Sequence, residues 1–167
     1  MNLISKIKLF AIGGLLLLAI ALLLSDRALP SSPELYSLKR LQEKIFMIVK
    51  TNPRDKVNYY NLLLDKRLNE LIAVVGNNQS ELILTSSLRY STTAGLMTEI
   101  IKAHHLTDAS TIAQEKFKEH QKMIRKLDDS YPKDENEEWK FIQDDYNYLA
   151  IYSQQLTDAF GNEITPQ

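Results

Sequence analysis

The hydrophobic residues of this chain recur every three or four positions over five segments, which cover residues 33–50, 53–75, 79–104, 108–129 and 136–160. That spacing places them on one side of an α-helix, where they form a narrow apolar stripe. The one short run that could alternate as a strand, Leu82-Ile83-Leu84, also fits the helical period. Narrow stripes joined by short connections are typical of antiparallel helices. The pattern therefore predicts an all-α fold of helical hairpins or a bundle of about five helices.

The first two segments begin with the same signals. Ser32 precedes Pro33 and Asn52 precedes Pro53, which fits an N-cap residue followed by a proline in the first turn. Gly76 stands where a glycine that ends a helix is common. We expect the two helices to pack as an antiparallel hairpin through two stripes, namely Leu38, Leu41, Ile45 and Ile48 in the first helix and Leu64, Leu68 and Leu71 in the second.

The last three segments carry stripes of their own. The third aligns Ile83, Ser87, Tyr90, Ala94, Met97 and Ile101. The fourth aligns Ala113, Phe117, His120, Ile124 and Leu127. The fifth aligns Trp139, Ile142, Tyr146, Leu149, Ser153, Leu156 and Phe160. The middle of the third segment, residues 85–87 and 91–95, is unusually small and polar for the interior of a helix.

Ahead of the helical part, an apolar run from Leu9 to Leu24 follows Lys6 and Lys8 and ends at Ser25-Asp26-Arg27. As a helix the run would be about 24 Å long, a little less than a bilayer core of about 30 Å. Its exit lacks the pair of small residues that marks a signal-peptide cleavage site. An uncleaved membrane anchor is therefore favoured over a cleaved signal peptide and over a buried soluble helix.

An anchor at this position divides the chain into parts. The lysines before the run, and the balanced charges after it, predict that the N-terminus stays in the cytoplasm and that the rest lies outside the cell membrane. We expect a single-pass protein with a cytoplasmic tail over 1–8, a membrane segment over 9–24, a linker over 25–32, an extracytoplasmic helical domain over 33–160 and a disordered tail over 161–167.

Composition excludes several classes of function. Residues 1–28 hold three of the 20 Lys and Arg residues and one of the 21 Asp and Glu residues, so the remainder carries a net charge of −3. This mixed balance argues against a nucleic-acid partner. The chain has no cysteine, which excludes disulfides, thiolate nucleophiles and metal sites with Cys ligands. The helical domain must therefore be held together by its own core.

Residues 29–71 resemble a bacterial family known as domain of unknown function 5667. Its members place a motif Leu-Pro-Gly-x-x-Leu-Tyr-x-x-Lys-Arg outside a membrane segment, followed by a pair of amphipathic helices. The counterpart here runs from Leu29-Pro30 to Lys39-Arg40, with Ser31 in place of the glycine and one residue inserted before Leu35-Tyr36. Further matching features are Glu43-Lys44, 52–56 and 64–71. The resemblance implies a membrane-tethered helical domain outside the cytoplasm, with no assigned reaction.

The three histidines do not form a metal-binding pattern. His104 and His105 are adjacent, so on a helix their side chains point about 100° apart and do not converge on one ion. His120 falls on the apolar stripe of the fourth segment. We interpret it as a core histidine that is hydrogen-bonded to Tyr90 or Tyr146, and not as a metal ligand.

Other residues with chemical potential also favour structural interpretations. The acidic residues of 128–138 and the pair Asp144-Asp145 lack the spacing of a calcium loop, so we interpret them as solvated. The sequence has no Gly-x-Ser-x-Gly motif and no Gly-rich phosphate loop. The aromatic residues of the last segment, Trp139, Tyr146, Tyr148 and Tyr152, could line a ligand groove, but a core with tyrosine hydroxyls at its rim is favoured.

The sequence thus points to an interaction or scaffold domain without catalytic activity, whose partner is a protein or another component of the cell envelope. The alternative is a periplasmic client-binding chaperone of the stress type or a ligand-binding protein. An enzyme ranks third, because ionisable groups do not converge in the sequence. We assign no catalytic, cofactor-binding or metal-binding residue and no cofactor.

Overall fold

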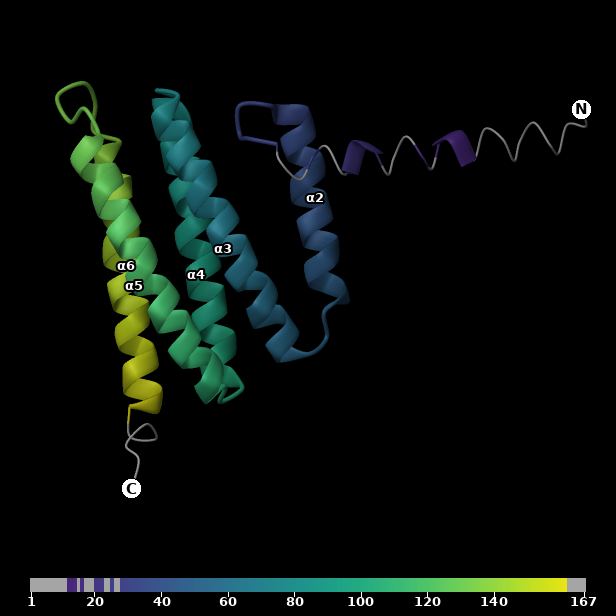
Figure 1. Cartoon of the computed structure of the whole chain (residues 1–167), viewed down its shortest axis with the longest axis vertical. Helices are drawn as coiled ribbons and strands as arrows, with labels where there is room; N and C mark the ends of the chain where they lie inside the picture. The colour runs from purple at the N-terminus through teal and green to yellow at the C-terminus, as the bar shows by residue number, and fades with distance from the viewer. Residues whose placement is uncertain (1–11, 15, 17–19, 23–24, 26–27, 162–167) are drawn as a thin grey trace, which may run out of the picture. The chain divides into compact units, whose positions relative to one another are not determined.

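The computed structural model describes residues 12–14, 16, 20–22, 25 and 28–161, and over these residues the chain is helical without a β-strand (Figure 1). The helices are α2 (Pro33–Val49), α3 (Pro53–Gly76), α4 (Ile83–Ala103), α5 (Thr107–Ser130) and α6 (Trp139–Phe160), with a short 3₁₀ helix, η1 (Ser80–Leu82), before α4. The prediction of an all-α fold is confirmed, and the helix ends agree with the predicted ends to within a few residues.

Within the described part of the chain, no helix combines the length and the apolar character that a membrane crossing requires. The predicted cytoplasmic tail, 1–8, lies outside the described residues. The same holds for most of the predicted membrane segment, 9–24, and for residues 162–167 of the predicted tail.

The chain forms two compact units, Met1–Ile48 and Val49–Gln167. In the first unit the face of α2 that is buried is not the predicted one. Leu41, Ile45 and Ile48 are exposed, whereas Lys39 is buried. The Lys39 ammonium donates a hydrogen bond to the Ala28 carbonyl at 3.0 Å, and this pairing allows a charged side chain to be buried along its aliphatic stem.

The second unit consists of two antiparallel hairpins, α3 with α4 and α5 with α6 (Figure 1). The hairpins pack on each other mainly through α4 and α6. Helices α3 and α5 also face each other, but their contact is less extensive, and a seam lies between them. This seam contains the polar groups and grooves described below.

The core of the second unit confirms the predicted stripes of α3 to α6. All six predicted stripe residues of α4 are buried, from Ile83 to Ile101. Leu64, Leu68 and Leu71 of α3 are also buried, within the core that α3 shares with α4, α5 and α6. We had predicted that these leucines pack against the stripe of α2. That prediction is wrong, because the residues they pack with belong to the second unit.

Local signals set where α3 begins and ends. The Asn52 side chain accepts a hydrogen bond from the Arg54 amide at 2.8 Å, as the predicted N-cap, and Pro53 opens the helix. At the other end the helix extends through Gly76, but the left-handed backbone conformation occurs at Asn78, with φ of 55°. Asparagine tolerates this conformation better than most residues, so the turn into η1 does not require a glycine at 78.

The small polar residues of α4 have two structural roles. Thr93 and Thr98 donate to the carbonyls of Arg89 and Ala94 one turn earlier, so their hydroxyls are satisfied within the helix. Gly95 faces Tyr152 of α6, and a Cβ atom at position 95 would lie 2.9 Å from the tyrosine hydroxyl. Small side chains thus let α6 approach α4 closely.

Candidate functional site

A chain of hydrogen bonds crosses the second unit from its interior to its surface. The Tyr90 hydroxyl of α4 lies 3.0 Å from His120 Nδ1 of α5. His120 Nε2 lies 2.9 Å from Asp65 Oδ1 of α3. The Lys116 ammonium donates to both Asp65 carboxylate oxygens, at 2.9 and 3.0 Å. Tyr90 is fully buried, whereas the Asp65 side chain is 40 % exposed.

The partners of His120 define its protonation state. Because the Asp65 carboxylate can only accept, Nε2 carries the hydrogen, and Nδ1 accepts the hydrogen bond of the Tyr90 hydroxyl. Burial lowers the pKa of His120, and this effect outweighs the opposing influence of Asp65. The imidazole is therefore neutral at pH 7. The predicted core histidine is confirmed, with Tyr90 as the partner.

Asp145 of α6 extends this polar region deeper into the unit. Its side chain is fully buried, and neither carboxyl oxygen makes a hydrogen bond of ordinary geometry within the described residues, although the Ser87 hydroxyl lies close enough to act on it. Burial raises the pKa of Asp145 to about 8; the charge of Asp144 adds to the rise and the Ser87 hydroxyl opposes it. The carboxyl group is therefore mostly protonated at pH 7. Burial raises the pKa of the Tyr90 phenol, and the charges of Asp145 and Asp65 add to the rise.

Our interpretation of Asp144-Asp145 as a solvated pair is correct for Asp144 and wrong for Asp145. The sequence contained a signal for this burial. Position 145 is three residues after Ile142 and four before Leu149, so it belongs to the apolar face of α6. Asp65 and Lys116 were also missed, since their partners are more than 50 positions away along the chain.

The order carboxylate, imidazole and hydroxyl is the one that activates a nucleophile in hydrolases, but here the geometry opposes that use. The hydroxyl belongs to a tyrosine with no exposed surface. Its pKa is raised, whereas an activated nucleophile needs a lowered pKa or access to a substrate. The chain can hold and exchange protons among its own members, but it does not present a reacting atom to a ligand.

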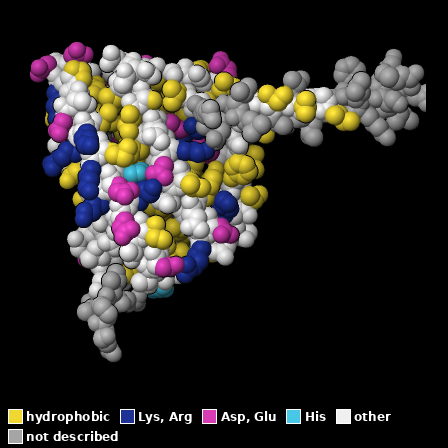
Figure 2. All heavy atoms as spheres, viewed as in Figure 1, with side chains coloured by type: hydrophobic (Ala, Val, Ile, Leu, Met, Phe, Trp, Pro, Cys, Tyr) yellow, Lys and Arg dark blue, Asp and Glu magenta, His cyan; other side chains and the backbone are white. Residues whose placement is uncertain are grey.

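An apolar groove lies in the same seam, beyond His120. It has a volume of about 370 Å³ and opens to solvent. Its lining consists of Ile72, Met123, Lys126, Leu127 and Ser130. Figure 2 shows hydrophobic side chains gathered between the positions of α5 and α3, with basic side chains beside them along α5. From residue 116 to residue 126, α5 carries five Lys or Arg residues and one acid, Glu119.

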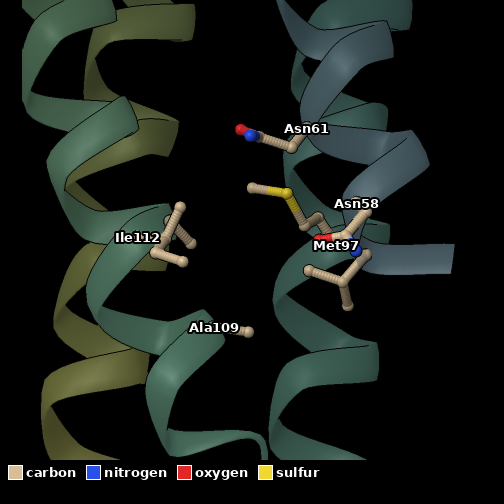
Figure 3. Close-up of a pocket in the computed structure, with 7 residues that line it drawn as sticks. Asn58, Asn61, Met97, Ala109 and Ile112 are labelled. Atoms are coloured by element: carbon tan, nitrogen blue, oxygen red, sulfur yellow. The ribbon is translucent and has the colours of Figure 1, made fainter. Parts of the chain in front are cut away.

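Nearer the other end of the seam is a small cavity of about 20 Å³, which is room for about one water molecule. Figure 3 shows Asn58, Asn61 and Met97 on one side of it and Ala109 and Ile112 on the other. The Asn61 side-chain oxygen is buried there without a hydrogen-bond partner in the described residues. The cavity is too small for an organic ligand.

The remaining residues singled out from the sequence do not converge. His104 and His105 are exposed at the end of α4, and the described residues include no group of three or more His, Asp or Glu residues that could hold a metal. Trp139, Tyr146 and Tyr152 are partly buried and pack on the core, as predicted, while Tyr148 is exposed. Lys133 and Lys140 both lie over the Trp139 ring, at 5.1 and 6.0 Å.

The fold and this site define the class of the protein as a helical domain with a buried polar chain and an open apolar groove. A family model described as Domain of unknown function (DUF5667) matches residues 27–134, and the chain belongs to this family. The match extends the resemblance from the first two helices through α5, and it includes Asp65, Tyr90 and His120. Helix α6, with Asp145, lies beyond the matched range. Comparisons with curated proteins and with solved structures gave no match.

Proposed function

We propose that this chain is a membrane-tethered helical domain outside the cytoplasm that binds a protein partner and performs no catalysis. The tether is the segment 9–24, and the N-terminus lies in the cytoplasm. Support for this topology comes from the sequence, in which Lys6 and Lys8 precede the uninterrupted apolar run. The four-helix unit then faces the cell exterior or the periplasm.

The groove between α3 and α5 is the observation on which the binding role rests. Ile72 and Leu127 are partly buried in its lining, and Met123 is 42 % exposed. Apolar surface of this kind marks interaction sites, and methionine adapts its shape to different side chains. Lys122 and Lys126 are exposed on the same helix. Their charges favour a partner segment with apolar side chains flanked by acidic ones.

The burial of Tyr90 supports a role without catalysis. A general acid–base or nucleophilic site needs ionisable groups that converge on a pocket able to hold a substrate. In the second unit Tyr90, His120 and Asp145 are ionisable groups that act on one another, and each is buried in the core. Their arrangement suits the stability and specificity of the fold better than a reaction.

Cysteine labelling tests the topology, because the chain contains no cysteine of its own. Thr111→Cys places a thiol on the exposed face of α5, and Ser5→Cys places one in the predicted cytoplasmic tail. In intact spheroplasts, a membrane-impermeant maleimide should label the first variant and not the second. After lysis it should label both. Labelling of Ser5→Cys alone in intact spheroplasts would contradict the proposed orientation.

Substitution in the groove tests the binding role. Met123→Lys adds a charge to the groove, and Ile151→Lys adds the same charge at a half-exposed position of α6. Chemical cross-linking in membranes should recover a partner protein with the wild-type chain and with Ile151→Lys, but not with Met123→Lys. Equal recovery with both variants would exclude the groove as the binding surface.

The chaperone alternative is favoured by apolar side chains exposed outside the groove, among them Leu62, Leu88 and Ile112. A chaperone of this kind would suppress the aggregation of reduced insulin at substoichiometric ratios. It would do so equally well with Met123→Lys, because no single groove would be responsible. A specific binder would have no effect on insulin aggregation.

A further inference from the structure

Asp145 is an acid in the interior of the unit, at the contact between α6 and α4. It is fully buried, and its backbone neighbours pack on α4, where the Ser87 hydroxyl donates to the Phe141 carbonyl of α6 at 3.1 Å. A protonated carboxyl group can be buried at moderate cost, but an ionised one requires donors or a counter-charge. The donors near Asp145 therefore decide what happens when it loses its proton.

Two hydroxyl groups of α4 act on Asp145, and each already donates to another group. Ser87 donates to Phe141, and Tyr90 donates to His120 Nδ1. If Tyr90 turned to an ionised Asp145, His120 Nδ1 would lose its donor and remain buried without a partner. An ionised Asp145 therefore gains the Tyr90 hydroxyl only if His120 Nδ1 is left unsatisfied, which is costly in a dry core.

The charged and titratable groups around Asp145 also offer no compensation. On α6 these are Asp144, whose charge opposes ionisation of Asp145, and Tyr152. From α4 the titratable neighbour is Tyr90. Behind Tyr90 lie His120 of α5, which is neutral, and Asp65 of α3, whose charge is paired with Lys116. None of these groups places a positive charge next to Asp145.

We propose that Asp145 acts as a pH-responsive latch between α6 and α4: the contact holds while Asp145 carries its proton and loosens when Asp145 ionises. The latch closes at neutral and acidic pH and opens in mildly alkaline conditions, because the pKa of Asp145 is raised to about 8. The His120 bond to Tyr90 contributes by keeping the phenol from stabilising the ionised acid. The proposal concerns the fold itself and does not depend on the membrane topology or on the partner.

Direct titration of the Asp145 carboxyl group tests the first half of the proposal. In the full chain, solubilised in detergent micelles and labelled with carbon-13 aspartate, the Asp145 carboxyl resonance should shift between pH 7 and pH 9. It can be assigned by its loss in Asp145→Asn. An Asp145 carboxyl resonance that titrates near pH 4 would overturn the proposal.

Trp139 reports on the second half, because it is the only tryptophan and it begins α6. Acrylamide quenching of its fluorescence should increase at least twofold from pH 7 to pH 9 in the wild-type chain as α6 loosens. In Asp145→Asn, which removes the ionisable group, quenching should stay constant. Asp144→Asn, at the exposed neighbouring position, should retain the increase. An equal rise in wild type and Asp145→Asn would overturn the latch, because the change would then not depend on the Asp145 carboxyl group.

Discussion

Gly95 of α4 and Tyr152 of α6 occupy adjoining space, such that a Cβ atom on residue 95 would lie 2.9 Å from the tyrosine hydroxyl oxygen and 3.1 Å from the ring carbon that bears it. The backbone at Gly95 is ordinary α-helix, so the glycine serves the contact with α6 and not a special conformation. It explains why a helix of this length has a glycine in its interior.

We predict that Gly95→Ala destabilises the fold in the wild-type chain by about 1 kcal/mol, because the added methyl group displaces Tyr152. In a Tyr152→Ala background the same change should stabilise by about 0.5–1 kcal/mol, since alanine is the better helix former. A double-mutant cycle by urea denaturation measures the difference. Stabilisation by Gly95→Ala in both backgrounds would show that the contact imposes no constraint.

Removing the Tyr90 hydroxyl should leave His120 Nδ1 buried without a donor. We expect Tyr90→Phe to lower the free energy of unfolding by about 1–3 kcal/mol, the cost of an unsatisfied buried polar group. Tyr148→Phe, at an exposed position of α6, should change it by about 0.5 kcal/mol or less. Chemical denaturation of the three proteins provides the comparison. Equal effects of the two substitutions would mean that the Tyr90–His120 bond does not contribute.

The leucines of α3 should differ sharply from those of α2. Leu64→Ala and Leu68→Ala remove side chains that are fully buried, and each should cost about 2–5 kcal/mol. Leu41→Ala and Asn69→Ala lie at exposed positions and should cost about 0.5 kcal/mol or less. A large loss at Leu41, measured by thermal unfolding, would indicate that the α2 stripe is covered in solution.

His120 should make the fold less stable in acid. Its pKa is lowered in the folded state, so the unfolded chain binds the proton first as the pH falls through about 6.5. The free energy of unfolding should then fall by at most about 1.4 kcal/mol per pH unit from this group. His120→Gln should remove that dependence, while His104→Gln, at an exposed position, should retain it. Above about pH 4 the buried Asp145 makes the free energy of unfolding fall as the pH rises, which is opposite to the effect of His120. The quantity to compare is therefore the difference in pH dependence between His120→Gln and His104→Gln.

Much of the fold follows from periodicity, because the stripes of α3 to α6 depend on local spacing that the sequence displays directly. The buried face of α2 could not be predicted in this way. Lys39 is buried through a hydrogen bond to the carbonyl of Ala28, a backbone group that no side-chain pattern reveals. His120 could be interpreted correctly because a histidine on an apolar face needs a hydrogen-bond partner. Asp145 could not be separated from Asp144 by composition; only its register with Ile142 and Leu149 distinguished it.

The seam between α3 and α5 was beyond prediction for a different reason. Its groups come from two helices that are not consecutive, and the pairing of Asp65 with Lys116 depends on how the two hairpins are placed against each other. The groove likewise arises from the lesser contact between these two helices, a property of packing that neither helix encodes alone.

The cap at Asn52 has a consequence for how this chain can vary. Helix α3 starts with its own cap and proline, and the boundary between the two units lies at Ile48. Thr51 therefore lies in a short connection that contributes to the start of neither helix. Residues added or lost there would change the length of the connection and leave both helices with their own ends intact. We expect relatives of this chain to differ in length at this connection more readily than within any helix. The length of the connection can then change in evolution without altering the four-helix unit.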